Sequence, residues 1–219
     1  TERQINEIIS VIESGIKETG LSRDVLLGVG MGIPGLLDSK EGKSIFSPNL
    51  GWKDLMIKDI LEARIKLPVM IDNSVRLGTL GEKWWGAGKG KNNLITLYIG
   101  TGIGSGLILN DKLFHGSQEA AGEIGHITVS ENGPRCSCGK YGCLEVMASG
   151  PAIAGQARRL IQQGVDSKLV QMCNGDLEKI TGEMVYLATI NGDSVAKEAL
   201  VQAGRYIGIG ISIMVNLIN

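Results

Sequence analysis

The chain has 219 residues, of which 43% are hydrophobic and 21% charged, and its net charge is −1. This length and composition suffice for one large domain or two lobes around a packed core. No basic run is present, so the chain itself is a poor candidate for nucleic-acid binding. The longest apolar run, residues 206–218, is shorter than the roughly 20 residues of a membrane span, and no secretory signal is recognisable. We therefore expect a cytoplasmic protein that does not contact a membrane.

Apolar spacing predicts an alternation of helices and strands in the first half of the chain. The isoleucines between residues 5 and 16 recur at helical spacing, and Gly20 follows them as a helix stop. A polar triplet, residues 72–74, stands where a strand ends and a helix begins, as a helix cap does. The predicted elements of this half are a helix over 5–16, strands over 25–33 and 67–71, helices over 57–65 and 75–85, and strands over 94–99 and 106–110.

The second half of the chain is predicted to be mostly helical. Its pattern indicates helices over 151–163, 181–191 and 195–217, with Pro151 in a first-turn position. Strands separated by helices, with glycine turns at the strand ends, argue for an α/β fold. The chain opens in a helix and closes inside an apolar pattern, so we expect a piece of a longer protein.

One histidine and three cysteines lie close together in the sequence. His126, Cys136, Cys138 and Cys143 have the spacing H-x9-C-x-C-x4-C. Soft thiolates with one imidazole form a tetrahedral zinc set, and four protein ligands leave no position for a catalytic water. The alternatives are a disulfide or free thiols, and a disulfide needs an oxidising compartment. We therefore predict a structural zinc site, and we interpret the distant Cys173 as a small buried residue.

Two glutamates flank this set. Glu123 stands three residues before His126, and Glu145 stands two residues after Cys143. If one imidazole nitrogen binds zinc, the other bears a proton that it must donate. A sugar hydroxyl is a suitable acceptor, and the two carboxylates can accept from neighbouring hydroxyls. The sequence thus suggests a polar ligand pocket beside the zinc site.

Two further segments allow both a functional and a structural interpretation. A glycine-rich segment between two strands contains Gly100, Thr101, Gly102 and Gly104. Its backbone N–H groups could bind a phosphate, or the glycines could simply form the turn of a hairpin. Residues 72–74 suit a ligand at a strand end or a plain helix cap. Three other features are interpreted structurally: His115 as a structural or surface residue, Trp84 and Trp85 as packing residues, and the glycines at 204, 208 and 210 as sites of close helix packing.

Together these segments resemble the ROK family, which contains bacterial sugar kinases and sugar-responsive transcriptional repressors. Residues 29–38 are similar to its G-x-P-G-x-x-D strand and turn, residues 100–106 to its second phosphate loop, and residues 122–126 with 136–145 to its signature. The resemblance implies a bilobal actin-like ATPase fold, the ribonuclease H-like fold of hexokinase, actin and Hsp70, incomplete here at both ends. A smaller lobe would comprise residues 1–74. A larger lobe, which would contain the zinc site and the sugar pocket, would comprise residues 75–219.

The resemblance also implies roles for individual residues. Sugar hydroxyls would meet Asn73, Glu123, His126 and Glu145, with a backbone contact near Gly35. The phosphate loop would comprise Gly100, Thr101, Gly102 and Gly104. Zinc would be held by His126, Cys136, Cys138 and Cys143, so His126 serves both the metal and the sugar.

One departure from the family pattern bears on catalysis. Family kinases carry an aspartate base directly after the asparagine, and Ser74 occupies that position here. General-base catalysis is typically worth about 10²–10⁴ in rate, and a lone serine hydroxyl does not supply it. Asp72 lies two positions away and is the alternative base. Because Ser74 occupies the base position, we assign no catalytic residue. The family's first phosphate loop, D-x-G-G-T, is also absent from these residues.

The sequence therefore favours the repressor branch, as a monosaccharide sensor that does not catalyse a reaction. Xylose and glucose are both compatible with the resemblance as the bound sugar. DNA would be contacted only through a winged helix-turn-helix head outside these residues. The family also suggests a homo-oligomer. The alternatives are an ATP-dependent hexose kinase, which would use ATP and Mg²⁺, and a scaffold that keeps the fold and zinc without binding sugar.

Overall fold

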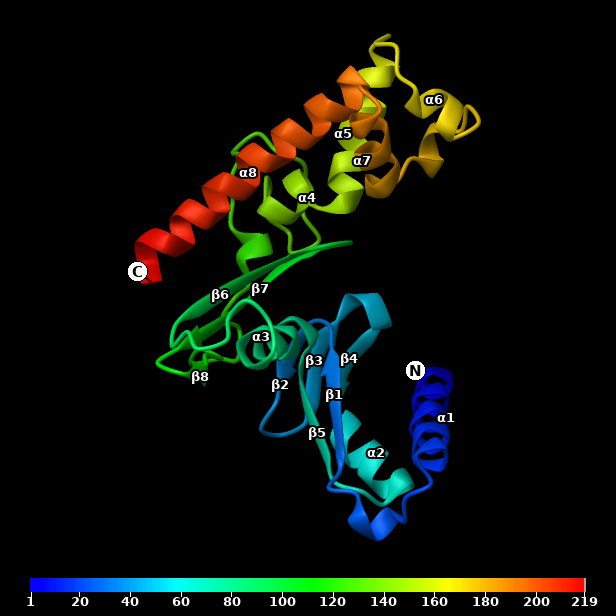
Figure 1. Cartoon of the computed structure of the whole chain (residues 1–219), viewed down its shortest axis with the longest axis vertical. Coiled ribbons are helices and arrows are strands. Elements are labelled where there is room, and N and C mark those ends of the chain that lie inside the picture. The colour runs from blue at the N-terminus through cyan, green and yellow to red at the C-terminus, as the bar shows by residue number, and fades with distance from the viewer. Residues whose placement is uncertain (219) are drawn as a thin grey trace. The chain divides into compact units, whose positions relative to one another are not determined.

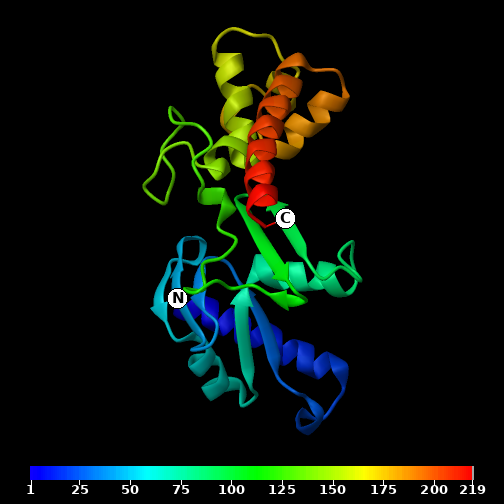
Figure 2. The same cartoon turned by 90° about the vertical axis from the view of Figure 1, so that its left-hand side faces the viewer.

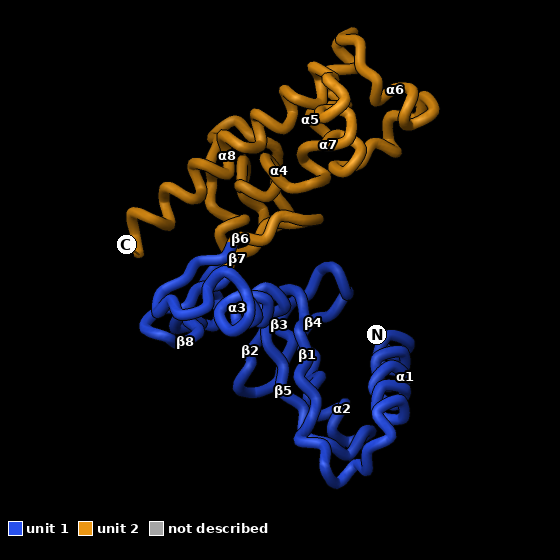
Figure 3. Tube along the Cα trace, in the orientation of Figure 1, with its two compact units in different colours: residues 1–96, 106–122 blue, residues 97–105, 123–219 orange. Residues whose placement is uncertain are grey.

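The computed structural model describes residues 1–218, which form two compact units (Figure 3). Unit 1 comprises Thr1–Thr96 and Gly106–Gly122, and unit 2 comprises Leu97–Ser105 and the chain from Glu123 onward. The helix that follows Asn73 belongs to unit 1. The division into lobes after residue 74 stays a prediction.

Unit 1 is built around two parallel strands. β1 (Val29–Ile33) pairs with β5 (Val69–Asn73) in a register that sets Ile33 beside Asn73. This pairing brings the end of β5 next to the Pro34–Gly35 turn, which directly follows β1. α1 (Glu2–Thr19) and α2 (Ile57–Ile65) contribute buried isoleucines and leucines to the core around these strands (Figure 1). α1 ends at Gly20, whose φ is 65°, so the predicted helix and its stop are confirmed.

A short antiparallel sheet follows the turn and was not predicted. Its strands, in the order β2-β3-β4, are Leu36–Asp38, Lys43–Ser47 and Trp52–Leu55. Gly35 has a φ of 105°, and a Cβ at this position would overlap the Phe46 carbonyl group, so only glycine fits. The Ser47 hydroxyl donates to the Pro34 carbonyl at 2.6 Å. The sheet therefore fixes the backbone of the turn beside Asn73.

The remaining strands form a sheet in the order β6-β7-β8. Their bounds are Leu94–Ile99, Ile103–Leu109 and Lys112–Leu113. The prediction for β6 is confirmed, but β7 begins three residues earlier than predicted. The reason is a tight turn, in which the Gly100 N–H donates to the Gly102 carbonyl at 2.9 Å and the strand resumes at once.

Helices make up most of unit 2 (Figure 2). They are α4 (Leu144–Ala148), α5 (Gly150–Gln162), α6 (Leu169–Met172), α7 (Gly182–Ile190) and α8 (Ser194–Ile218). The Ser149 hydroxyl caps α5, and the Thr181 hydroxyl caps α7. The buried positions of α5 and α8 include several alanines, which allow close approach of the helices. The three long helices predicted in this half are confirmed. Short 3-10 turns occupy Arg23–Val25, Pro48–Leu50, Ile124–His126 and Leu177–Lys179.

α8 extends well beyond the apolar run at residues 206–218. Within residues 1–218 it is the one helix long and apolar enough to cross a membrane, judged by length and composition alone. Its buried positions, from Val195 to Met214, pack in unit 2 against α4, α5 and α7. Gly210 is buried and lies against Leu144, as predicted for close packing. Gly204 and Gly208 are exposed, and a Cβ added at either would have no neighbour within 4 Å, so the prediction is wrong for those two.

Trp84 and Trp85, interpreted as packing residues, are both exposed, so that interpretation is wrong. α3 (Ser74–Trp84) turns Arg76 and Thr79 inward, and its end leaves the tryptophans 54% and 78% exposed. Their rings contact each other edge to face, with centroids 5.2 Å apart.

Candidate functional site

The predicted zinc ligands converge in unit 2. His126, Cys136, Cys138 and Cys143 each offer one ligand atom, and these atoms all lie within 4.8 Å of one another. His126 Nδ1 is 3.5 Å from Cys136 Sγ, and Cys138 Sγ is 3.6 Å from Cys143 Sγ. Tetrahedral zinc, with bonds of about 2.3 Å to sulfur and about 2.0 Å to nitrogen, sets such pairs about 3.6–3.8 Å apart. The residues present therefore fit a zinc ion.

Backbone hydrogen bonds shape the loop that carries the cysteines. The Cys136 N–H donates to the Lys140 carbonyl at 2.7 Å, and the Gly139 N–H donates to the Cys136 carbonyl at 3.0 Å. Gly142 has a φ of 61°, and a Cβ there would overlap the Ser130 carbonyl group. This glycine lets the chain turn back directly before Cys143, so that the fourth ligand reaches the other three.

The thiols differ in how readily they ionise. Burial raises the pKa of the Cys143 thiol to about 12, and the neighbouring Cys138 and Cys136 thiols act in the same direction. A hydrogen bond from the Lys140 backbone lowers the pKa of the Cys138 thiol below its usual value of 9.0. A divalent cation favours the thiolate form of every ligand, so zinc binding here would release protons.

The polar residues predicted to meet a sugar in unit 2 lie around this loop. His126 turns Nδ1 toward the thiols, while its Nε2 lies 3.9 Å from Glu123 Oε2. Glu145, in the first turn of α4, accepts the Ile103 N–H at 2.9 Å. A Cβ on Gly125, between Glu123 and His126, would lie 3.5 Å from the Glu145 Cβ. The structure thus brings Glu123, His126 and Glu145 together within one unit.

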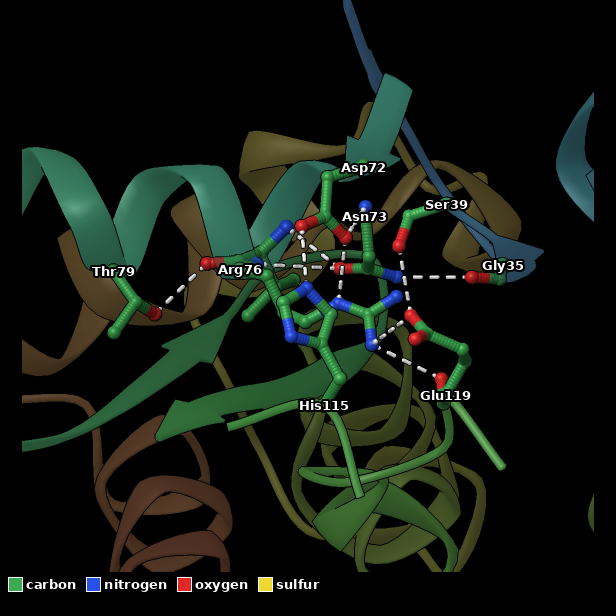
Figure 4. Close-up of polar contacts among 9 residues, drawn as sticks. Gly35, Ser39, Asp72, Asn73, Arg76, Thr79, His115 and Glu119 are labelled. Atoms are coloured by element: carbon green, nitrogen blue, oxygen red, sulfur yellow. Dashed lines mark hydrogen bonds and ion pairs between the residues drawn. The ribbon is translucent and has the colours of Figure 1, made fainter. Parts of the chain in front are cut away.

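The other two predicted sugar contacts meet in unit 1. The Asn73 side-chain carbonyl accepts the N–H groups of Val75 at 2.8 Å and of Arg76 at 3.4 Å, which caps α3. The Asn73 amide donates to the Gly35 carbonyl at 2.9 Å (Figure 4). One of its two amide hydrogens has no partner among residues 1–218 and can serve a ligand. The helix-cap and ligand interpretations of Asn73 are therefore compatible.

An ionic cluster beside Asn73 was not predicted (Figure 4). Arg76 Nε lies 2.8 Å from Asp72 Oδ1, and Arg76 Nη1 donates to the Glu119 carbonyl at 3.0 Å. His115 Nε2 lies 2.9 Å from Asp72 Oδ2, and the Asn73 N–H donates to Asp72 Oδ1 at 2.6 Å. Both oxygens of the Asp72 carboxylate are thus engaged. The Asp72 to Arg76 spacing of four residues was the available signal in the sequence.

The residues of the predicted phosphate loop do not all lie at one site: some line a cavity, and one lies within a strand. Gly100 and Thr101 line a cavity of about 520 Å³ in unit 2, together with the starts of α5 and α7 at Gly150 and Gly182. Helix N-termini and glycine backbone favour anions. A Cβ on Gly102 would overlap the Glu145 carboxylate, and Gly104 lies inside β7 rather than in the turn. The turn itself is limited to residues 100–102.

Comparison with known proteins identifies relatives of two kinds. The model of the ROK family matches residues 1–219. A xylose repressor of Caldicellulosiruptor bescii is 35% identical over 218 residues, which are 100% of this chain and 54% of that protein. A glucokinase of Halalkalibacterium halodurans is 38% identical over 202 residues, which are 90% of this chain and 60% of that protein. The chain therefore spans a little over half the length of the curated relatives that it matches.

Solved structures give the same two kinds of neighbour. A ROK family transcriptional regulator, described as a homologue of the E. coli MLC protein, aligns with 98% of this chain and 53% of its own at a TM-score of 0.85 and 32% identity. A ROK family glucokinase from Streptomyces griseus, in complex with glucose and AMPPNP, aligns with 97% of this chain and 69% of its own at a TM-score of 0.83 and 31% identity. The chain has their α/β fold, the actin-like ATPase fold.

Proposed function

Because the chain belongs to the ROK family, we propose that it is the sugar-binding effector domain of a transcriptional repressor, a sensor that binds a monosaccharide without phosphorylating it. One observation carries this proposal. Ser74 stands at the position of the catalytic base of the family kinases, while the polar residues expected to meet sugar hydroxyls are all retained. A site that keeps its binding groups and lacks its base can recognise the sugar but cannot activate a sugar hydroxyl for attack.

The contacts available to a monosaccharide are few and polar. Asn73 contributes one N–H, and the Gly35 backbone lies beside it. His126 contributes the proton on Nε2 when Nδ1 faces the zinc ligands, and Glu123 and Glu145 contribute acceptors. Zinc, when bound, fixes the loop that carries His126 and thereby orients this donor.

Asp72 does not replace the missing base. Its Oδ1 faces the Arg76 guanidinium and the Asn73 N–H, and its Oδ2 faces His115. A carboxylate whose two oxygens are held by these partners has no oxygen directed to a sugar hydroxyl. This geometry supports a sensor over a kinase.

Sugar binding would act on DNA through an equilibrium between two arrangements of the repressor. A ligand shifts such an equilibrium only by its difference in affinity for the two states. The DNA contact is assigned to a winged helix-turn-helix head outside these residues, because the chain itself has a net charge of −1 and no basic run.

Titration calorimetry with a panel of aldoses tests the proposal. Xylose and glucose are the first two sugars, because relatives are named as a xylose repressor and a glucokinase. We expect one of the panel to bind the intact protein, and Glu145→Gln to weaken that binding by about tenfold or more because a charged acceptor is lost. The matched control is Glu131→Gln, an exposed glutamate in the cysteine loop. Absence of heat with every sugar would contradict the proposal.

The second candidate function is an ATP-dependent hexose kinase. The cavity of about 520 Å³, with Gly100, Thr101 and two helix N-termini on its rim, favours it, as do the glucokinase relatives. A coupled phosphorylation assay on the intact protein separates the two functions. The sensor predicts no turnover in the parent, and a gain of turnover in Ser74→Asp is compatible with it. Efficient turnover in the parent, retained by Ser74→Ala, would establish the kinase instead.

A further inference from the structure

A buried guanidinium lies in unit 1 between two acidic side chains. The Arg76 side chain is 4% exposed, and those of Asp72 and Glu119 are 13% and 15% exposed. Arg76 Nη1 lies 3.7 Å from Glu119 Oε2, in addition to its hydrogen bond to the Glu119 carbonyl. Burying an arginine so fully is unfavourable unless its charge is balanced. Here the Asp72 and Glu119 carboxylates lie within ion-pair distance, although Arg76 Nε forms no hydrogen bond within residues 1–218.

The backbone at Glu119, in another segment of the chain, is also constrained by Arg76. Its φ is 56°, a left-handed conformation that residues with a Cβ rarely adopt. Such a conformation persists where the surroundings fix it. Here the Arg76 guanidinium holds both the carbonyl and the carboxylate of Glu119, and the Ser39 hydroxyl donates to the same carboxylate at 2.9 Å. The segment that leads along the chain toward Glu123 is thereby anchored to α3.

The same guanidinium acts on Asn73 through Asp72. Asp72 Oδ1 faces the Arg76 Nε at 2.8 Å and accepts the Asn73 backbone N–H at 2.6 Å (Figure 4). Asn73 in turn holds the Gly35 carbonyl. Arg76 is therefore linked to Asn73 through Asp72, and to the Gly35 carbonyl through Asp72 and Asn73.

We propose that Arg76 is a positioning residue of the sugar site, which sets Asn73 through Asp72 and fixes the 115–119 segment through Glu119. This inference rests on the proposed sugar binding. Arg76 contributes affinity by holding the site in its binding geometry before the sugar arrives, so its removal weakens binding while the direct contacts remain.

Calorimetry of the intact protein, with the aldose that binds the parent, tests the inference well below the melting temperature of each variant. Arg76→Met should weaken binding by about tenfold or more. Arg76→Lys should weaken it less, because an ammonium group can pair with one carboxylate but lacks the planar fork that engages both. The control is Lys43→Met, which removes the exposed ion pair to Asp54 in the same unit and should leave the affinity within about twofold.

A double substitution separates positioning from a general loss of stability. Asn73→Ser keeps a helix-capping hydroxyl but loses the amide that serves the sugar. If Arg76 acts through Asn73, Arg76→Met has a smaller effect on affinity in the Asn73→Ser background than in the parent. Strictly additive effects, or full affinity in Arg76→Met, would overturn this inference alone. If Arg76→Met does not fold, Arg76→Lys takes its place in the same cycle. A parent protein that binds no aldose would overturn the proposed function and this inference together.

Discussion

The cysteine loop of unit 2 and the Arg76 cluster of unit 1 position polar groups by opposite means. The loop, residues 126–143, has few buried apolar side chains beyond its own cysteines, and its four ligand atoms converge on one point. The Arg76 cluster lies beside a core of fully buried residues such as Ile33, Leu37 and Leu61, and contains no metal-binding set. One region offers four ligand atoms to a metal cation, and the other carries its own cation in a side chain.

This difference explains why the two regions differ in sequence. We expect zinc to contribute folding free energy to the loop, which has few buried apolar side chains and is otherwise held by backbone hydrogen bonds. A cluster beside a core needs only charge balance and hydrogen bonds, because the surrounding strands and helices already exclude water. The two regions should therefore respond to different perturbations.

The largest effect is expected from Cys138→Ser, which removes one ligand of the metal set. We expect the loss of one equivalent of bound zinc and a fall in melting temperature of about 10 °C, because structural zinc contributes folding free energy. Elemental analysis and differential scanning calorimetry measure the two quantities. Cys173→Ala is the control, since Cys173 is buried elsewhere in unit 2 and should leave the zinc content unchanged. A Cys138→Ser protein that melts like the parent would contradict the metal assignment.

Arg76→Met is expected to have the next largest effect on stability. Removing one partner of a buried ion pair leaves the other charge uncompensated, which costs about 3 kcal/mol. Urea unfolding measures the loss in free energy of unfolding. Repeating the measurement with a zinc chelator separates this loss from the contribution of the metal. The chelator should destabilise the parent and Arg76→Met by the same amount, because the metal acts only on the loop. Equal stability of parent and variant would show that Asp72 and Glu119 find other partners.

A smaller effect separates backbone geometry from metal binding in the loop. Gly142→Ala sets a methyl group against the Ser130 carbonyl in a left-handed conformation, and we expect a loss of about 2 kcal/mol together with weaker zinc binding. Gly139→Ala also has a positive φ, of 91°, but its Cβ would have no neighbour within 4 Å. Competition with a zinc indicator should show a lower zinc affinity for Gly142→Ala than for Gly139→Ala. The reverse ranking would mean that steric fit before Cys143 does not limit metal binding.

Asp193 provides a third contrast, a charge held by neither metal nor ion pair. Burial acts to raise its pKa, but hydrogen bonds from the Ala196 and Lys168 N–H groups and the Ser167 hydroxyl hold the pKa below the usual 3.8. A lowered pKa in the folded state contributes stability above the unfolded value, and this stability is lost as pH falls through the folded pKa. Asp193→Asn should therefore cost about 1 kcal/mol above about pH 5 and progressively less in acid. A cost independent of pH would contradict the charge assignment.

Most helices and the zinc set could be predicted because their signals are local. The isoleucine spacing of α1 and the four zinc ligands each lie within about 20 residues, where periodicity and spacing carry the information. The strands β2, β3 and β4 were missed because they have only three to five residues each and their pairing partners are set by the turn geometry at Gly35.

The long-range contacts of the Arg76 cluster could not be predicted for a different reason. His115 and Glu119 lie 43 residues from Asp72 and Arg76 respectively, and no pattern in a single sequence marks such a pairing. Trp84 and Trp85 were interpreted as packing residues, but α3 uses its inward face for Arg76 and Thr79 and leaves both tryptophans exposed. Tertiary contacts override composition at these positions.

We propose that the protein binds a monosaccharide and releases it unchanged. Equilibrium dialysis of the intact protein against radiolabelled aldose, in the presence of Mg²⁺ and ATP, tests both parts of this proposal at once. We predict retention of the label, with all of the recovered sugar neutral on an anion-exchange column. Label recovered as a sugar phosphate, or no retention of any aldose, would contradict the account.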